Sequence, residues 1–123
     1  MATDRDIEQF IGDSFSSIWD LELLSLLLED RATPRSAAQL VERMRASDLV
    51  VDQGINSLVA VGLATLDNER RLVFQPVNDE LADCAVRASE FYRRFPGRTR
   101  RLMIAKQSPG LTAFADAFRL RKE

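Results

Sequence analysis

Apolar residues recur at helical spacing through the first part of the chain. Phe10 and Ile11 follow Ile7 by three and four residues, a spacing that predicts an amphipathic first helix. Residues 17–30, SIWDLELLSLLLED, then carry apolar side chains on most sides of the helix that they predict. A helix of that kind belongs in the middle of a small bundle, because it needs cover all round. Pro34 cannot continue the helix and marks its end.

Polar residues at the helix starts refine these boundaries. A Ser or Thr three residues before an acidic residue or Gln satisfies free N–H groups in the first turn of a helix. The chain has three such pairs, Thr3 with Asp6, Ser17 with Asp20, and Ser36 with Gln39. The third pair predicts a short helix whose inward residues are Ala37, Leu40, Val41 and Met44.

Another helix is expected only a short turn later. Ser47 is its predicted N-terminal cap, and Gly62 stands where a C-terminal cap is needed. The apolar spacing predicts that Val51, Ile55, Leu58 and Val59 face inward. The residues predicted to face outward are Asp48, Asp52, Gln53, Asn56 and Ser57.

The pattern then changes to that of short strands. Residues 63–67 and 71–76 read as two strands joined by a tight turn around Asn68 and Glu69. Leu72 begins the alternation of apolar and polar positions in the second strand. The sequence therefore predicts a β-hairpin.

Two further helices are expected toward the C-terminus. Asn78 caps the first, which runs to about Phe95 and is broken by the Pro-Gly pair that follows. A basic segment, RTRRLMIAKQ, separates it from a last short helix that starts at Ser108 and Pro109. That helix would carry Leu111, Phe114 and Phe118 on its apolar side.

Together these elements predict a mainly α fold with a two-stranded β-hairpin and flanking N- and C-terminal helices. We expect one domain over residues 1–96, with its core motif at 17–76. Residues 97–123 are expected to form a basic C-terminal extension that contains the short amphipathic helix.

Composition excludes several classes of function. The 123-residue chain contains no histidine and one cysteine, so it lacks His-based catalysis, His-based metal sites and disulfides. It has no Gly-rich phosphate loop either. We expect no enzyme activity, no cofactor and no metal. Cys84 is interpreted as a small buried residue, or else as a thiol whose pKa Arg87 could lower. No apolar run is long enough to span a membrane and no secretory signal is present, so the expected location is the cytoplasm.

Charge is distributed unevenly along the chain. Residues 1–90 carry a net charge of −9, and residues 91–123 carry +7. The basic cluster at the second helix end and in the extension consists of Arg93, Arg94, Arg98, Arg100, Arg101 and Lys106. It could follow a nucleic-acid backbone, or it could pair with the acidic body of its own chain or of a sister subunit.

The order helix, capped helix, tight turn, helix and hairpin resembles that of the bacterial winged helix-turn-helix regulators of the MarR-like kind. The stretch SAAQLVERMRASDLVVDQGINSLVAVGLATLDNERRLVFQP carries the resemblance, through its capped helix and the GL step into the hairpin. The resemblance covers residues 17–76, about half of the chain. The closing FADAFRLRK is also similar to the ends of small uncharacterised winged-helix proteins of proteobacteria.

This resemblance implies a dimeric, DNA-binding transcription regulator. The second helix of the motif would enter the major groove and present Gln53, Asn56 and Ser57 to base edges. Arg70 and Arg71 would place the hairpin, or wing, on the DNA backbone. Arg43 and Arg45, with Arg35, are the backbone candidates on the other side.

Charge sets this chain apart from such regulators. Residues 36–76 carry a net charge of −1, and the recognition helix contains two aspartates and no basic residue. DNA-binding winged helices usually present a basic face there. An alternative therefore keeps the fold and changes the partner to another regulatory protein. A third interpretation, a repressor that senses a small molecule, requires a pocket between the helices at 17–30 and 78–95.

Surfaces for a homodimer or for a protein partner are predicted from apolar stripes. One stripe lies on the helix that Asn78 caps and comprises Leu81, Ala85, Ala88, Tyr92 and Phe95. It is interpreted either as core packing against the leucine-rich helix or as a dimer seam. The last short helix, with Leu111, Phe114 and Phe118, is expected to dock into a groove of its own chain or of a partner.

Overall fold

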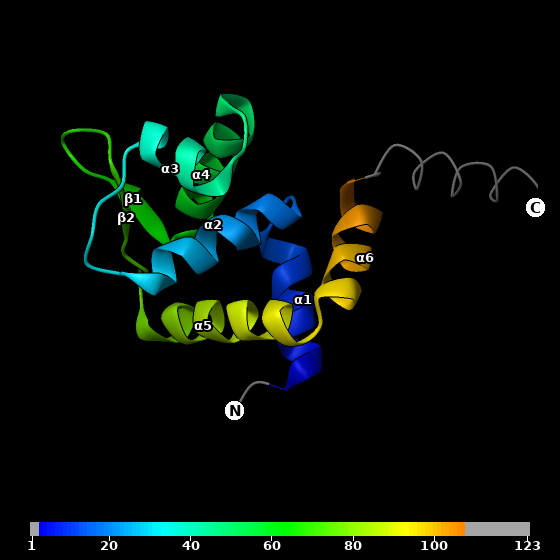
Figure 1. Cartoon of the computed structure of the whole chain (residues 1–123). Helices are drawn as coiled ribbons and strands as arrows, with labels where there is room; N and C mark the ends of the chain where they lie inside the picture. The colour runs from blue at the N-terminus through cyan, green and yellow to red at the C-terminus, as the bar shows by residue number, and fades with distance from the viewer. Residues whose placement is uncertain (1–2, 108–123) are drawn as a thin grey trace, which may run out of the picture.

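The computed structural model describes residues 3–107, which form six α-helices and one β-hairpin (Figure 1). The elements are α1 (Asp4–Ser14), α2 (Ile18–Glu29), α3 (Ala37–Met44), α4 (Asp48–Val61), β1 (Ala64–Leu66), β2 (Leu72–Phe74), α5 (Asp79–Arg94) and α6 (Pro96–Gln107). The prediction of a mainly helical protein with a two-stranded antiparallel hairpin is confirmed. None of the helices within residues 3–107 combines the length and the apolar character needed to cross a membrane.

The helix boundaries follow the capping residues that the sequence indicated. Complete capping boxes begin α1, α2 and α3, each with a side chain bonded to the backbone in both directions. Ser47 caps α4 and Asn78 caps α5 through single bonds to the third residue beyond. Gly62 ends α4 with φ of 93°, a left-handed conformation that glycine adopts without steric cost.

The leucine-rich helix α2 occupies the centre of the fold. It packs against α4 most extensively, then against α5, and also contacts α3, α6 and β2. Leu21, Leu23, Leu24 and Leu27 are completely or almost completely buried. The prediction that this helix lies inside the bundle is confirmed, and the reason is its nearly uniform apolar surface.

A glycine lets α2 and α4 approach closely. Gly54 is buried in the middle of α4, and a Cβ atom placed on it would lie 3.1 Å from Cδ2 of Leu23. That distance is tighter than normal side-chain packing. Gly54 is therefore a contact point between the two helices, although glycine inside a helix costs conformational entropy.

The hairpin has a fixed register and an additional bridge. β1 and β2 pair antiparallel, with Ala64 opposite Phe74 and Leu66 opposite Leu72. Arg35, in the connection between α2 and α3, extends this sheet. Its N–H donates to the Leu72 carbonyl at 3.0 Å, and the Leu72 N–H donates back at 2.7 Å. The bridge fixes the start of α3 against the hairpin.

The prediction that Val59 faces inward is wrong, and of the two interpretations of the α5 stripe only core packing fits Ala85 and Ala88. Val59 is 39% exposed, because α4 turns its buried face through Val51, Ile55 and Leu58 instead. Ala85 and Ala88 are completely buried in the core of this chain. They therefore belong to the core-packing interpretation and cannot form a dimer seam, since no surface of them is left to contact a second subunit.

The start of the predicted C-terminal extension is part of the folded body. Residues 97–107 continue α6, which packs on α5, α1 and α2, and its Thr99 and Met103 are buried. Pro96 does end α5, but it also starts the next helix, as proline can at a first helical position. A boundary at residue 96 is therefore wrong for this part of the extension. The short helix predicted from Ser108 onward lies outside the described residues.

The glycine contact predicts opposite effects of two substitutions. We expect Gly54→Val to destabilise the fold by about 2 kcal/mol, because the added methyl groups would push Leu23 and α2 away from α4. Gly12→Ala is the matched control. Its Cβ would meet only Cδ1 of Leu102 at 3.8 Å, an ordinary contact, so a gain of roughly 0.5–1 kcal/mol is expected. Urea unfolding measures both, and a Gly54→Val protein as stable as the natural one would contradict the packing argument.

Candidate functional site

The outward face of α4 is polar and acidic. Asp48, Asp52, Gln53 and Asn56 are exposed, and Ser57 is half-buried. These positions follow from the helix period, because Val51, Ile55 and Leu58 point into the core. The predicted outward positions are confirmed, whereas their predicted contacts with DNA bases are not tested by this geometry.

Two grooves flank this face of α4. The first, of about 410 Å³, lies between α4 and the start of α2 and is lined by Ser16, Ser17, Asp20, Gln53, Asn56 and Ser57. The second, of about 390 Å³, lies between α4 and the hairpin and is lined by Ala37, Asp52, Ile55, Asn56, Leu66 and Arg70. Asn56 lines both grooves. The outer face of α4 therefore forms a ridge with a hollow on each side.

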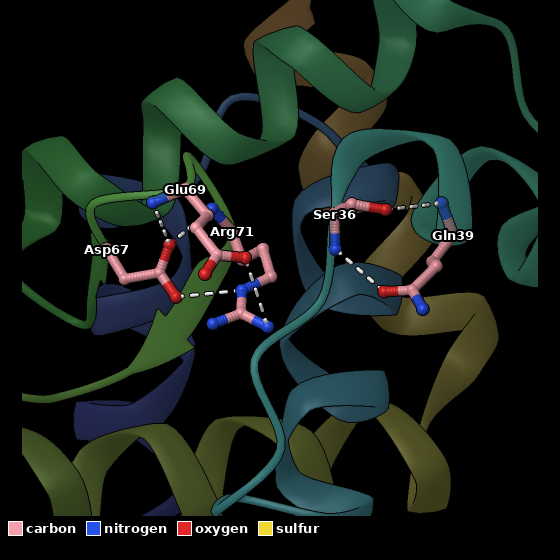
Figure 2. Close-up of polar contacts among 5 residues, drawn as sticks. All are labelled: Ser36, Gln39, Asp67, Glu69 and Arg71. Carbon is pink, nitrogen blue, oxygen red and sulfur yellow. Dashed lines mark hydrogen bonds and ion pairs between the residues drawn. The ribbon is translucent and has the colours of Figure 1, made fainter.

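The two arginines of the hairpin turn, Arg70 and Arg71, differ in how far their charge is neutralised by neighbouring carboxylates. Asp67 Oδ1 accepts hydrogen bonds from the N–H groups of Glu69 and Arg71, both at 2.9 Å. Its Oδ2 accepts from Nε of Arg71, also at 2.9 Å, and a carboxylate oxygen of Glu69 lies 3.6 Å from the same guanidinium (Figure 2). Arg71 is thus neutralised within the turn. This disfavours the predicted role of Arg71 as a contact to an external phosphate.

Arg70 remains available on the same turn. It is exposed, adopts a left-handed backbone with φ of 62°, and lines the groove beside Asp52 and Asn56. Its N–H donates to the Asp67 carbonyl at 2.9 Å, which holds the turn in this conformation. The sequence offered a signal for this difference. Asp67 and Arg71 are four residues apart across a turn, and an Asp at a turn start commonly bonds the backbone that follows.

The other predicted backbone contacts also differ in availability. Arg43 lies 3.5 Å from Glu29 in an exposed ion pair. Arg45 ends α3 in a left-handed conformation, with φ of 54°, and is exposed. Arg35 is half-buried, and its Nε has no hydrogen-bond partner among the described residues. Around α4, Arg45 and Arg70 are therefore exposed arginines that no ion pair within residues 3–107 neutralises.

The basic cluster partly pairs with the acidic body. Two nitrogens of the Arg98 guanidinium, Nε and Nη2, donate to the Glu8 carboxylate at 2.8 and 2.7 Å. This pair joins α6 to α1 and fits the alternative in which the cluster binds its own chain. Arg93, Arg94, Arg100 and Arg101 are exposed. The side chain of Lys106, like Leu111, Phe114 and Phe118, lies outside the described residues.

Only part of the apolar stripe on α5 reaches the surface, where it could contact another molecule. Its members Leu81, Tyr92 and Phe95 are half-buried and pack against the core. Tyr92 also donates a hydrogen bond to Glu22 on α2, and burial together with this bond raises the pKa of Tyr92. A partner contact through these three residues stays a prediction.

A small groove lies between α2 and α5, the place where a small-molecule sensor would need its pocket. It measures about 200 Å³, and the hydroxyls of Ser25 and Ser89 are 2.9 Å apart in its wall. Ligand pockets usually measure about 300–1,000 Å³, so this groove is small for the purpose. Cys84 is half-buried, and burial followed by the charges of Asp83 and Glu80 raises its pKa. Arg87, which is bound to Asp83 at 2.7 Å, acts in the opposite direction, but it lowers the pKa of Cys84 by less than these causes raise it.

Comparisons with known proteins leave the site to be interpreted from its own geometry. The chain matches no protein-family description, no curated protein and no solved structure. Within residues 3–107, no three His, Cys, Asp or Glu side chains gather as a metal site would require.

The turn network predicts an acid-dependent hairpin. Hydrogen bonds from Arg71 are the main cause that lowers the pKa of Asp67 below its ordinary 3.8. Because the folded pKa is the lower one, the stabilisation is complete above about pH 5 and is lost as the pH falls through the folded pKa. NMR titration of the Asp67 carboxyl should show this lowered pKa.

An Asp67→Asn substitution provides the second half of this experiment. We expect the variant to lack the part of the decrease in unfolding free energy at low pH that comes from protonation of Asp67. The substitution should also free the guanidinium of Arg71. Asp13→Asn, at an exposed position of α1, is the control. An ordinary pKa for Asp67 in the folded protein would contradict the network.

Proposed function

We propose that the protein is a winged-helix regulator of transcription that binds duplex DNA as a dimer. The order of α2, the bridge at Arg35, α3, α4 and the β1–β2 hairpin supports this proposal. In a winged helix-turn-helix the two helices of the motif are followed by such a hairpin, and the second helix enters the major groove. Here α4 would be the recognition helix and the β1–β2 turn the wing.

The observation that carries the proposal is the polar ridge of α4 between its two grooves. A ridge of this kind is suited to insertion into a groove of a duplex, with side chains pointing outward along the helix. Gln53 and Asn56 can pair bidentately with adenine, and Asp52 can accept a hydrogen bond from the amino group of cytosine. Ser57, half-buried beside them, suits either base or backbone.

The charges of the site predict an unusual balance between specific and non-specific binding. Arg35, Arg45 and Arg70 offer about three phosphate contacts per subunit, which corresponds to a salt slope of about −2.7 per subunit and about −5.4 for a dimer. Asp48 and Asp52 would oppose non-specific contact with phosphates. Binding is therefore expected to be weak on random DNA and to depend on base contacts.

The first experiment is the selection of genomic duplex fragments on the purified protein at roughly 50 mM salt, where phosphate contacts have the largest effect. A recurrent motif with two-fold symmetry, its half-sites about 34 Å apart, is expected for a dimer. The failure of every duplex to bind at low salt would refute the proposal.

Substitutions on the wing test the geometry of the proposed complex. We expect Arg70→Gln to reduce the salt slope of DNA binding by about one unit per subunit, because one phosphate contact is lost. Arg71→Gln should change the slope much less, since Asp67 and Glu69 already neutralise that side chain. Arg5→Gln on α1, which packs on α5 and α6, is the control. Equal losses for Arg70→Gln and Arg71→Gln would contradict the assigned contacts.

A second candidate function is recognition of another regulatory protein by the same face. The observation that favours it is the absence of any basic residue on α4, together with Leu49, which is 66% exposed at its start. The two candidates predict opposite effects of Asp48→Asn. Removal of this negative charge should strengthen DNA binding, whereas it should weaken the docking of a protein whose surface is basic.

A further inference from the structure

A groove on the outward face of α2 remains uncovered by the described part of the chain. It measures about 190 Å³ and lies between α2 and the end of α3. Trp19, Leu26 and Met44 supply its apolar surface. Glu22 and Glu29 supply two negative charges, and Arg43, which is paired with Glu29 at 3.5 Å, supplies one positive charge. Trp19 is 37% exposed, although it is a large apolar side chain beside two other partly buried ones. We call this surface the α2–α3 groove.

The described chain ends close to the start of this groove. The second half of α6 lies beside the end of α1, because Leu102 approaches Gly12, two residues before α1 ends. α6 also packs on α2. Tyr92 links the two helices, because its hydroxyl is hydrogen-bonded to Glu22 of the groove and also interacts with Arg100 of α6. The chain therefore leaves α6 at Gln107 near the α1–α2 connection, which is the end of α2 that carries Trp19 (Figure 1).

The sixteen residues that follow match the groove in length, polarity and charge. SPG at 108–110 permits a turn, and Leu111, Phe114 and Phe118 recur at helical spacing. As a helix, residues 111–122 would extend about 18 Å, while Trp19 and Glu29 are about 15 Å apart along α2. Residues 108–123 carry a net charge of +1, through Arg119, Arg121 and Lys122, whereas residues 1–107 carry −3.

We propose that residues 108–123 of the same chain bind in the α2–α3 groove, with Phe114 and Phe118 against Trp19, Leu26 and Met44. The chain leaves α6 near Trp19 and would run along α2 toward Glu29. In that direction the basic residues at the end of the segment would approach the carboxylate of Glu29 and share it with Arg43, whose ion pair with Glu29 is exposed. This contact closes the exposed side of the central helix and is independent of whether α4 binds DNA.

The single tryptophan of the chain gives a direct test, because Trp19 lies in the groove itself. We expect acrylamide to quench Trp19 weakly in the full natural chain. In the Phe114→Asp/Phe118→Asp variant the quenching constant should rise roughly twofold and the emission should shift to the red, because the groove loses its aromatic cover. Both substitutions lie outside residues 3–107, so far-ultraviolet circular dichroism and the unfolding midpoint serve to check that residues 3–107 stay folded.

A matched variant separates the contact from an effect of charge. Ala113→Asp/Leu120→Asp adds the same two charges to the opposite side of the predicted helix and should leave the quenching of Trp19 close to that of the natural chain. Equal quenching in the natural chain and in Phe114→Asp/Phe118→Asp would overturn the proposal. Protection of Trp19 that disappears on dilution, in parallel with dissociation of a dimer, would also overturn it, since the occupant would then be a second copy.

Discussion

The contact between α2 and α4 is the interaction on which the rest of the structure depends. α2 is apolar on nearly every side, so it is stable in water only when other elements surround it. Each leucine that it buries contributes roughly 2 kcal/mol, and α4 supplies the largest share of the cover. Gly54 favours this close approach, because a Cβ atom at that position would lie 3.1 Å from Cδ2 of Leu23, closer than side chains normally pack. By fixing the buried face of α4, the contact also determines which residues α4 presents to solvent.

Local hydrogen bonds then decide how charge is displayed around that outward face. Asp67 binds the backbone and guanidinium of Arg71, so the hairpin turn holds one arginine internally and presents Arg70. The net charge of a segment is therefore a poor measure of the charge available to a partner. On the other side of the molecule, Arg98 joins α6 to α1 through Glu8. Some of the basic residues toward the C-terminus therefore stabilise the fold by pairing with the acidic body, as Arg98 does with Glu8.

The candidate site combines an element order suited to DNA with a surface that has few available positive charges. Phosphate contacts give affinity and base contacts give specificity, so a site of this kind would lose non-specific binding first. The same lack of charge suits a protein partner. The choice between the two depends on the exposed residues of α4 and on Arg70, because the interior of the fold is compatible with both.

Local sequence determined the elements, their starts and their ends. Capping boxes such as Ser36 with Gln39 act over three residues, and the apolar periods of α2 and α4 are properties of short segments, so both could be predicted. Contacts between distant residues decided what remained. Val59 is exposed and Ala88 is buried because the packing angles of α4 and α5 fix which of their residues meet α2. The helical period alone leaves the rotation of each helix about its axis uncertain by about one residue. The bridge between Arg35 and Leu72, the pair of Arg98 with Glu8 and the α2–α3 groove likewise exist only after folding brings their elements together.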